Sequence, residues 1–296
     1  LIKPDSSLQG EAAPGRGRRL KARTRRQAGM PGDGIMRAMS SHRPPRYPRL
    51  WLPLLIASQL VIAWLWWWLG WQVGLPLLLA SHALCLWGVL APSSRLYGPV
   101  LTRLPGDGVW LTIDDGPSDD TRAVLDLLDA HGAKATFFLV GARAEARPEL
   151  VREIAARGHD IGNHSHTHPQ ARFWALGPAR MRREIDDAQA ALTRITGRAP
   201  VWFRSVVGHT NPFVHAPLRD AGLARVGWSA RGFDAVEADV DRVIARIDAD
   251  LAPGAIVLLH EGAKHGRNVA MLDGVLTRLR AKGLRAILPL DGPGQA

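Results

Sequence analysis

The stretch VWLTIDDGP, residues 109–117, decides the fold. Five residues that favour a buried strand lead directly into Asp114 and Asp115, and Gly-Pro then turns the chain. Residues 121–130 follow with apolar side chains at helical spacing. A strand followed by a helix in this way is typical of a β-α unit in a parallel sheet.

The alternation of strand and helix continues along the chain. Further strands are expected at 135–140, 160–162, 201–203, 224–228, 255–259 and 284–288, and further helices at 148–157, 178–196, 212–221, 240–251 and 269–282. Seven strands alternating with six helices predict an α/β fold with a parallel sheet, either a barrel or a doubly wound sheet. In both arrangements, functional residues gather at the carboxyl ends of the strands.

Chemically active side chains stand at these strand ends. Asp114 and Asp115 end the first strand, His164 follows the third, Arg204 ends the fourth, Asp234 follows the fifth and His260 ends the sixth. Polar residues scattered at random would not follow the strand ends in this way. The sequence therefore places one functional site at this edge of the sheet.

Three of the side chains favour a metal site. His164 and His168 are four residues apart, one helical turn, so both imidazoles are expected on one face. With Asp115 they offer two imidazoles and one carboxylate, which suits zinc with a further position open. His166 would point elsewhere and is expected to be a bystander of this site. The alternative is a polar loop that merely contains His164, His166 and His168.

The remaining groups suit acid–base chemistry. Neighbouring strand residues point to opposite sides, so Asp114 is left as a base beside the metal ligand Asp115. His260 can act as a general acid because the pKa of imidazole lies near neutrality, although alone it could equally be a structural histidine. The alternative for the Asp pair is two solvated or helix-capping acids. Together the set fits hydrolysis of an amide.

These motifs resemble the polysaccharide deacetylase family, the NodB homology domain of chitin, chitooligosaccharide and peptidoglycan deacetylases. TIDDGP at 112–117 looks like the family motif T-F-D-D-G-P, HSHTH at 164–168 matches H-[ST]-x-x-H, and LLH at 258–260 matches L-x-H. The resemblance covers about 106–290 and implies a distorted (β/α) barrel with fewer than eight strands. It also implies a divalent metal, most plausibly zinc, and an N-acetylated saccharide as substrate.

The resemblance also implies residue roles. Asp114 would be the base, oriented by Arg204; His260 would be the acid, with Asp234 as its partner; and Asp115, His164 and His168 would hold the metal. Two motifs are altered: RSVVG at 204–208 stands for R-x-P-x-G, and RGFDA at 231–235 keeps only the second Asp of D-x-x-D-W. Val207 and Leu258 are expected to contact substrate. The lost residues shape the groove, which weakens the expectation of a polymeric, chitin-like substrate.

A long apolar segment precedes this domain. Residues 50–94 contain no Asp, Glu, Lys or Arg, and one membrane span takes about 20 apolar residues. WLWWWLGWQVG at 64–74 places five Trp beside two Gly, which favours a turn at a membrane interface. The sequence therefore predicts a transmembrane helical hairpin over 50–92, with helices at about 50–69 and 75–91. A buried hairpin in a soluble protein is the alternative, whereas a signal peptide has a shorter apolar core.

The first 49 residues form a basic tail. They hold twelve Lys or Arg against three Asp or Glu, so nine of the eleven net positive charges lie here. This composition predicts disorder, and translation starting at Met30, Met36 or Met39 is a further hypothesis. A basic tail can bind nucleic acid, but no base-reading motif accompanies it and the body carries only +2, so no nucleic-acid partner is expected.

If the hairpin is inserted in a membrane, the positive-inside rule places the basic tail on the cytoplasmic side. Two crossings would return the catalytic domain to the cytoplasmic face; a single crossing would place it in the periplasm. Cys85 is the only cysteine, so no intrachain disulfide is expected. No sequence feature specifies an oligomeric state.

The leading hypothesis is a membrane-attached, metal-dependent hydrolase that removes an acetyl group, or alternatively a formyl group, from an amino sugar in an envelope glycan or a lipid-linked saccharide. The competing hypothesis is a catalytically inactive, membrane-anchored carbohydrate-binding protein on the same fold. Retention of both Asp114 and His260 argues for the enzyme, because a binding protein has no need of a base and an acid.

Overall fold

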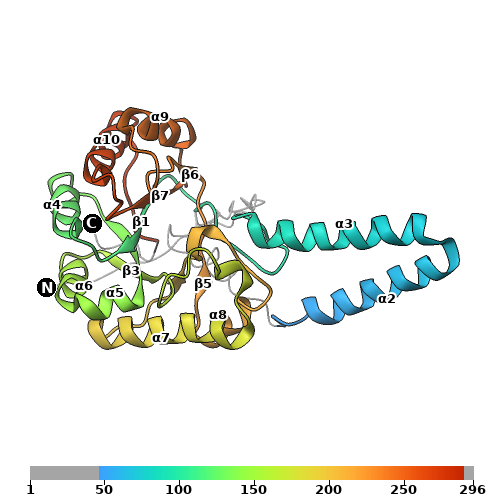
Figure 1. The fold of residues 1–296 in the computed structure, drawn as a ribbon. Helices are drawn as coiled ribbons and strands as arrows, with labels where there is room; N and C mark the ends of the chain where they lie inside the picture. The colour runs from blue at the N-terminus through green and yellow to red at the C-terminus, as the bar shows by residue number, and fades with distance from the viewer. Residues whose placement is uncertain (1–46, 290–296) are drawn as a thin grey trace, which may run out of the picture.

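A computed structural model describes residues 47–289 of the chain, and the fold consists of a parallel α/β body with a helical hairpin projecting from it (Figure 1). The basic tail predicted to be disordered lies almost entirely outside the described residues. The strands are β1 (Trp110–Gly116), β2 (Ala135–Leu139), β3 (Asp160–Asn163), β4 (Trp202–Phe203), β5 (Ala224–Arg225), β6 (Ala230–Arg231) and β7 (Ile256–His260). All pair in parallel in the order β5-β4-β3-β2-β1-β7-β6, which confirms the predicted seven-stranded parallel fold.

The sheet curls because its two edges are joined by a very short connection. β5 and β6 are the opposite edges, yet only residues 226–229 separate them in the chain. A flat sheet of seven strands, with neighbours about 4.8 Å apart, could not be crossed by so few residues. The sheet therefore bends into a partial barrel, as the family resemblance implies.

Two strand predictions need correction. The expected strand at 224–228 is instead divided between β5 and the connection toward β6, because the chain changes edges within it. The expected strand at 284–288 is reduced to one bridge, between Val109 and Ala286. The chain leaves the sheet there after a single pairing.

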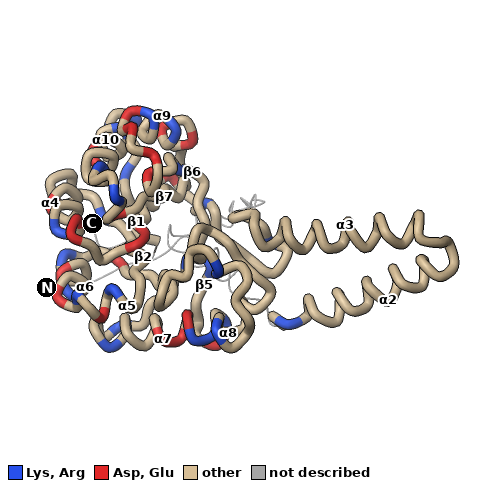
Figure 2. The backbone as a smooth tube through the Cα atoms, viewed as in Figure 1, with Lys and Arg blue, Asp and Glu red and all other residues tan. Residues whose placement is uncertain are grey.

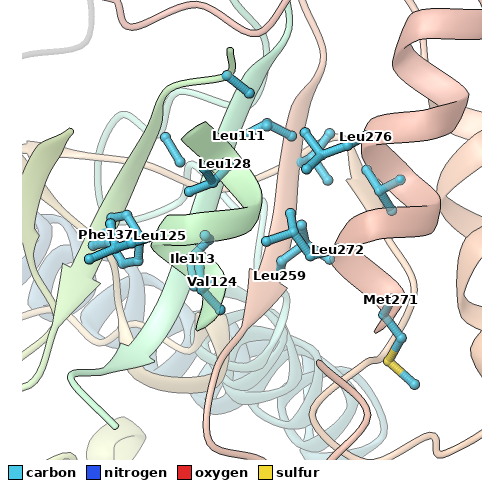
Figure 3. Packing of buried hydrophobic residues seen from close by; sticks show 14 of the residues in the cluster. Leu111, Ile113, Val124, Leu125, Leu128, Phe137, Leu259, Met271, Leu272 and Leu276 are labelled. Atoms are coloured by element: carbon cyan, nitrogen blue, oxygen red, sulfur yellow. The ribbon is translucent and has the colours of Figure 1, made fainter. Parts of the chain in front are cut away.

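The helices cover the outer face of the curled sheet. They are α4 (Thr121–Ala130), α5 (Gly141–Ala146), α6 (Pro148–Ala156), α7 (Pro178–Thr196), α8 (His215–Asp220), α9 (Val240–Asp250) and α10 (Asn268–Ala281). Of these, α5 was not predicted, and α8 begins three residues later than expected. Leu111 and Ile113 of β1 point outward to α4 and α10, as Figure 3 shows, where they pack with residues such as Leu125 and Leu276.

The alternate residues of β1 face the inside of the curl. Trp110 lies at the start of the strand and packs against Phe138 and Trp202, which gives the interior an aromatic floor. Thr112 follows on the same face, and Asp114 comes next at the carboxyl end. Because every second residue of a strand faces the same side, the inner face of β1 changes from the apolar Trp110 to the polar Asp114 within five residues.

The hairpin consists of α2 (Trp51–Leu69) and α3 (Trp71–Leu90), which lie side by side in Figure 1 and are joined at Gly70 with φ 83°. Gln59 of α2 donates to Ser81 of α3 at 3.3 Å. Figure 2 shows no charged residue along either helix, and both are long and apolar enough to cross a membrane. The second helix begins at Trp71 instead of about residue 75, because one glycine is enough to turn the chain.

The base of the hairpin is fastened to the body. The ring of Trp51 lies edge-on to that of Phe213, with centroids 5.4 Å apart. At the other helix, the Thr210 backbone N–H donates to the Val89 carbonyl at 3.0 Å. Both ends of the hairpin therefore meet the body on the same side, while the turn between α2 and α3 lies far from it (Figure 1).

Candidate active site

Asp115, His164 and His168 converge at the carboxyl end of the sheet. Their ligand-type atoms all lie within 4.8 Å of one another. Asp115 Oδ1 is 3.0 Å from His168 Nε2 and 3.6 Å from His164 Nε2. The structure therefore brings together the three residues predicted as metal ligands.

The backbone that achieves this differs from the sequence-based reasoning. The register between β1 and β2 shifts between Asp114 and Gly116, so Asp115 is the extra residue of a bulge, with φ 72°. Both carboxylates consequently face the same pocket instead of opposite sides of the sheet. The predicted helical turn between His164 and His168 is also wrong: the segment is a loop in which Ser165 and His168 have positive φ.

Hydrogen bonds orient the His164 ring and hold the loop that carries both imidazoles. His164 Nδ1 lies 2.8 Å from the Arg204 carbonyl oxygen, which leaves Nε2 directed toward Asp115. Buried Glu184 of α7 accepts from the backbone N–H of Thr167 at 2.8 Å and from its hydroxyl at 2.6 Å. Sequence reasoning missed Glu184, because nothing in its helix distinguishes it from a surface acid.

The electrostatics of this group suit a cation. Burial raises the pKa of Asp115, but His164 and His168 outweigh this effect and hold that pKa far below its usual range. Asp115 Oδ1 is buried, and although His168 Nε2 lies 3.0 Å away the two groups are not aligned for a hydrogen bond, which leaves a carboxylate oxygen available to a metal. Two imidazoles and one carboxylate form a donor set that fits a zinc-like divalent ion.

Asp114 is held beside this group by Arg204. The Arg204 guanidinium donates to Asp114 Oδ1 at 2.8 Å and to the Thr112 hydroxyl at 2.6 Å, and it stacks 4.3 Å from the centroid of the Phe138 ring. Arg204 is fully buried, and burial lowers its pKa while Asp114 opposes that shift. The other carboxylate oxygen, Oδ2, lies 3.8 Å from His164 Nε2.

His260 faces Asp114 from the neighbouring strand. The two residues are register partners on β1 and β7. Asp234 accepts from the His260 backbone N–H at 2.6 Å and lies 2.9 Å from His260 Nδ1. Burial lowers the pKa of His260, but the charge and hydrogen bond of Asp234, together with the charges of Asp114 and Asp115, raise it overall, to about 9. The ring is thus held in its protonated form at neutral pH.

A small pocket of about 130 Å³ joins these groups. It is lined by seven of the nine predicted site residues: Asp114, Asp115, His164, His168, Val207, Leu258 and His260. The other two, Arg204 and Asp234, lie behind it and bond to lining residues. His166 does not line the pocket; its Nε2 lies 3.9 Å from Glu145 on α5.

Several residues of the pocket rim were not predicted. Gln170, Gly208, Trp228, Arg231, Phe233 and Val236 contribute to the lining. The guanidinium of Arg231 lies 4.0 Å from the centroid of the Phe233 ring and 5.0 Å from that of Trp228. These residues lie in or beside loops that no periodicity marks, so only the altered motifs at 204–208 and 231–235 hinted at any of them.

Comparisons with known proteins agree with this geometry. Residues 102–226 match the family described as polysaccharide deacetylase. A chitooligosaccharide deacetylase of Bradyrhizobium sp. (strain ANU 289) is 36% identical over 198 residues, which cover 66% of this chain and 88% of that protein. The relative is thus matched over most of its length.

Solved structures share the fold. The Bc1960 peptidoglycan N-acetylglucosamine deacetylase is 31% identical with a TM-score of 0.59, covering 64% of this chain and 89% of its own. A family 4 carbohydrate esterase from Streptomyces lividans in complex with acetate is 33% identical with a TM-score of 0.57, covering 63% and 95%. BA3943 of Bacillus anthracis, described as a CE4 family pseudoenzyme, is 25% identical with a TM-score of 0.56, covering 62% and 63%.

Proposed function

Because the chain belongs to the polysaccharide deacetylase family, and is thus a hydrolase of the carbohydrate deacetylase class, we propose that it is a metal-dependent, membrane-attached enzyme that removes an acetyl group from an amino sugar. The observation that carries the proposal is the single pocket lined by the Asp115–His164–His168 group, Asp114 and His260. The substrate belongs to an envelope glycan or a lipid-linked saccharide.

Asp115, His164 and His168 would hold a divalent ion, most plausibly zinc. Bound there, such an ion supplies Lewis-acid chemistry: it polarises a carbonyl and makes water easier to deprotonate. The residues around it contribute orientation. The Arg204 carbonyl fixes the tautomer of His164, and Glu184 holds the loop that carries both imidazoles.

The residues divide the proton transfers between two sides of the amide. Asp114, oriented by Arg204, takes a proton from the water that attacks the acetyl carbonyl. His260, kept protonated by Asp234, gives a proton to the amine nitrogen as the C–N bond breaks. Acetate and a free amino sugar are the products. The register pairing of Asp114 with His260 supports this division, because it places base and acid on adjacent strands.

Two hairpin features support membrane attachment. Both helices have the length and composition of spans, and their apolar side chains are largely exposed. Since the hairpin starts and ends against the body, we place the body on the same side of the membrane as the basic tail, which the positive-inside rule assigns to the cytoplasm. Reporters fused after Ala296 test this: a cytoplasm-active reporter should give signal, and signal from a periplasm-active one would mean a single crossing.

The competing function is an inactive carbohydrate-binding protein. It is favoured by the altered motifs around Val207 and Phe233 and by the likeness to a pseudoenzyme. Acetate release from a panel of N-acetylated saccharides, measured on metal-loaded protein, decides between the two. Release that disappears in Asp114→Asn supports the enzyme, whereas saccharide binding without release supports the binding protein.

A further inference from the structure

A second cavity, larger than the catalytic pocket, lies where the hairpin meets the body. Its volume is about 580 Å³, within the usual range for small-molecule sites. Most of the lining is apolar and comes from both hairpin helices, with Trp51, Leu55, Leu84 and Val89 among the contributors. None of the lining residues is Asp, Glu, Lys or Arg. An apolar ligand is the chemistry that such walls accept.

The cavity lies at the end of the hairpin nearest the body. Its α2 residues come from the first two turns of that helix, and its α3 residues come from the second half. When the hairpin is inserted, this end lies at the membrane surface, where a lipid chain can leave the bilayer while its polar head stays in water.

Two loops connect this cavity to the catalytic pocket. Gln170 lines the catalytic pocket, and Trp174 on the same loop lines the apolar cavity. On the other loop, Gly208 lines the pocket and Pro212 lines the cavity. Four residues of chain reach no more than about 14 Å, so the two spaces are close neighbours.

The second loop is also pressed against the end of α3. A Cβ atom placed on Gly208 would lie 2.8 Å from Cβ of Pro92 and 2.4 Å from the Trp228 ring. The backbone of the catalytic pocket therefore contacts the first turn beyond the hairpin directly.

We propose, on the basis of the function given above, that the substrate is a lipid-linked amino sugar whose apolar chain occupies this cavity while its N-acetyl group enters the catalytic pocket. The hairpin then has a part in substrate recognition in addition to attachment. The reaction itself is unchanged: water adds to the acetyl carbonyl, the amide C–N bond breaks, and the lipid stays on the sugar.

The test uses the full chain in phosphatidylcholine nanodiscs and two glycosides of N-acetylglucosamine, one methyl and one dodecyl. We expect kcat/KM for the dodecyl glycoside to be roughly tenfold or more above that for the methyl glycoside, and the difference to arise from a lower KM. Burial of about two methylene groups is enough to supply a factor of this size. Ser58→Phe, which fills the cavity, should remove this preference and leave methyl glycoside turnover unchanged. Leu79→Phe, on an exposed hairpin position outside the lining, should keep it.

The outcomes separate the two proposals. If Ser58→Phe kept the preference intact, the dodecyl chain would only be partitioning into the bilayer. If both glycosides had equal kcat/KM values, the cavity would have no part in substrate recognition. Either result overturns this inference and leaves the deacetylase function standing. Release of acetate from neither glycoside nor any other N-acetylated saccharide would overturn the function itself.

A second readout does not depend on the filled variant. Cys85 lines the cavity and is the only cysteine, so its alkylation by a maleimide reports occupancy. In the Asp114→Asn protein, which should not consume the ligand, the dodecyl glycoside should slow alkylation several-fold and the methyl glycoside should not. Equal alkylation rates with both glycosides would contradict the proposal.

Discussion

The catalytic pocket has a buried half and an exposed rim, and the two differ in how they are held. The buried half consists of Asp114, His164, Arg204 and Asp234. Each of these residues is at most 3% exposed to solvent, and hydrogen bonds join each one to a strand end or a backbone group. The rim contains Val207, Phe233 and Val236, which are 40%, 44% and 79% exposed. The buried half agrees with the family motifs, whereas the rim departs from them.

This contrast indicates which properties each half controls. A residue fixed by several buried partners can perform proton transfer or hold a ligand reproducibly, because its geometry is imposed by the strands. An exposed loop residue can change without disturbing that geometry. We therefore expect changes in the buried half to alter the reaction itself, and changes in the rim to alter which saccharide is preferred.

The largest effect should follow removal of a metal ligand. His164→Ala should lose most of the bound divalent ion and with it nearly all acetate release, because only two of the three donors remain. Metal content per chain and acetate release measure this. His166→Ala is the matched control, since His166 does not line the pocket and should keep both properties. Full metal occupancy in His164→Ala would remove that histidine from the site.

The base should have the next largest effect. Asp114→Asn keeps the shape of the side chain but cannot accept a proton, so turnover should fall by about 10²–10⁴-fold. Metal content should stay normal, because Asp115, and not Asp114, is the proposed carboxylate ligand. Asp119→Asn, at a side chain that is 95% exposed, should leave turnover unchanged. Normal turnover in a metal-loaded Asp114→Asn protein would mean that another group is the base.

Asp234, the partner of the proposed acid His260, should determine how activity depends on pH. His260 must be protonated to donate, and its pKa of about 9 predicts activity below that pH and a loss as the pH rises through it. Asp234→Asn removes the charge that raises this pKa while burial continues to lower it, so the alkaline limb of the pH–rate profile should move to lower pH. An unchanged profile would show that Asp234 does not control the protonation of His260.

The smallest effect is expected at the rim. Val236→Ala removes two methyl groups from a side chain that is mostly in solvent, so kcat should change by less than about threefold, with any difference in KM. Steady-state kinetics on two N-acetylated saccharides of different length would measure it. A fall in kcat as large as that of Asp114→Asn would erase the distinction between the two halves.

The three longest strands, two of which carry candidate catalytic residues, were predictable from the sequence. β1, β2 and β7 are buried runs of five to seven residues, and their predicted positions agree with the structure to within a few residues. The two-residue strands β5 and β6 carry no periodicity, so the change of edge between Arg225 and Ala230 could not be predicted. It depends on closure of the whole sheet, which is a tertiary effect.

The site residues were predictable for a similar reason, but their backbone was not. Asp115 and His168 are found by residue type and spacing, yet both adopt positive φ, which residue type and spacing do not encode. The predicted convergence of Asp115, His164 and His168 is present, although it arises from a bulge and a loop instead of a strand and a helical turn. The rim is formed by loops from three separate segments of the chain, and no local sequence pattern marks these loops.

The most direct test of the proposed function is acetate release by the whole chain of residues 1–296 from N-acetylated saccharides, measured first after chelation and then after zinc is restored. We expect no release without metal, recovery with about one ion per chain, and no recovery in Asp114→Asn. Folded protein that binds one zinc per chain, yet releases no acetate from soluble or lipid-linked N-acetyl sugars, would contradict it.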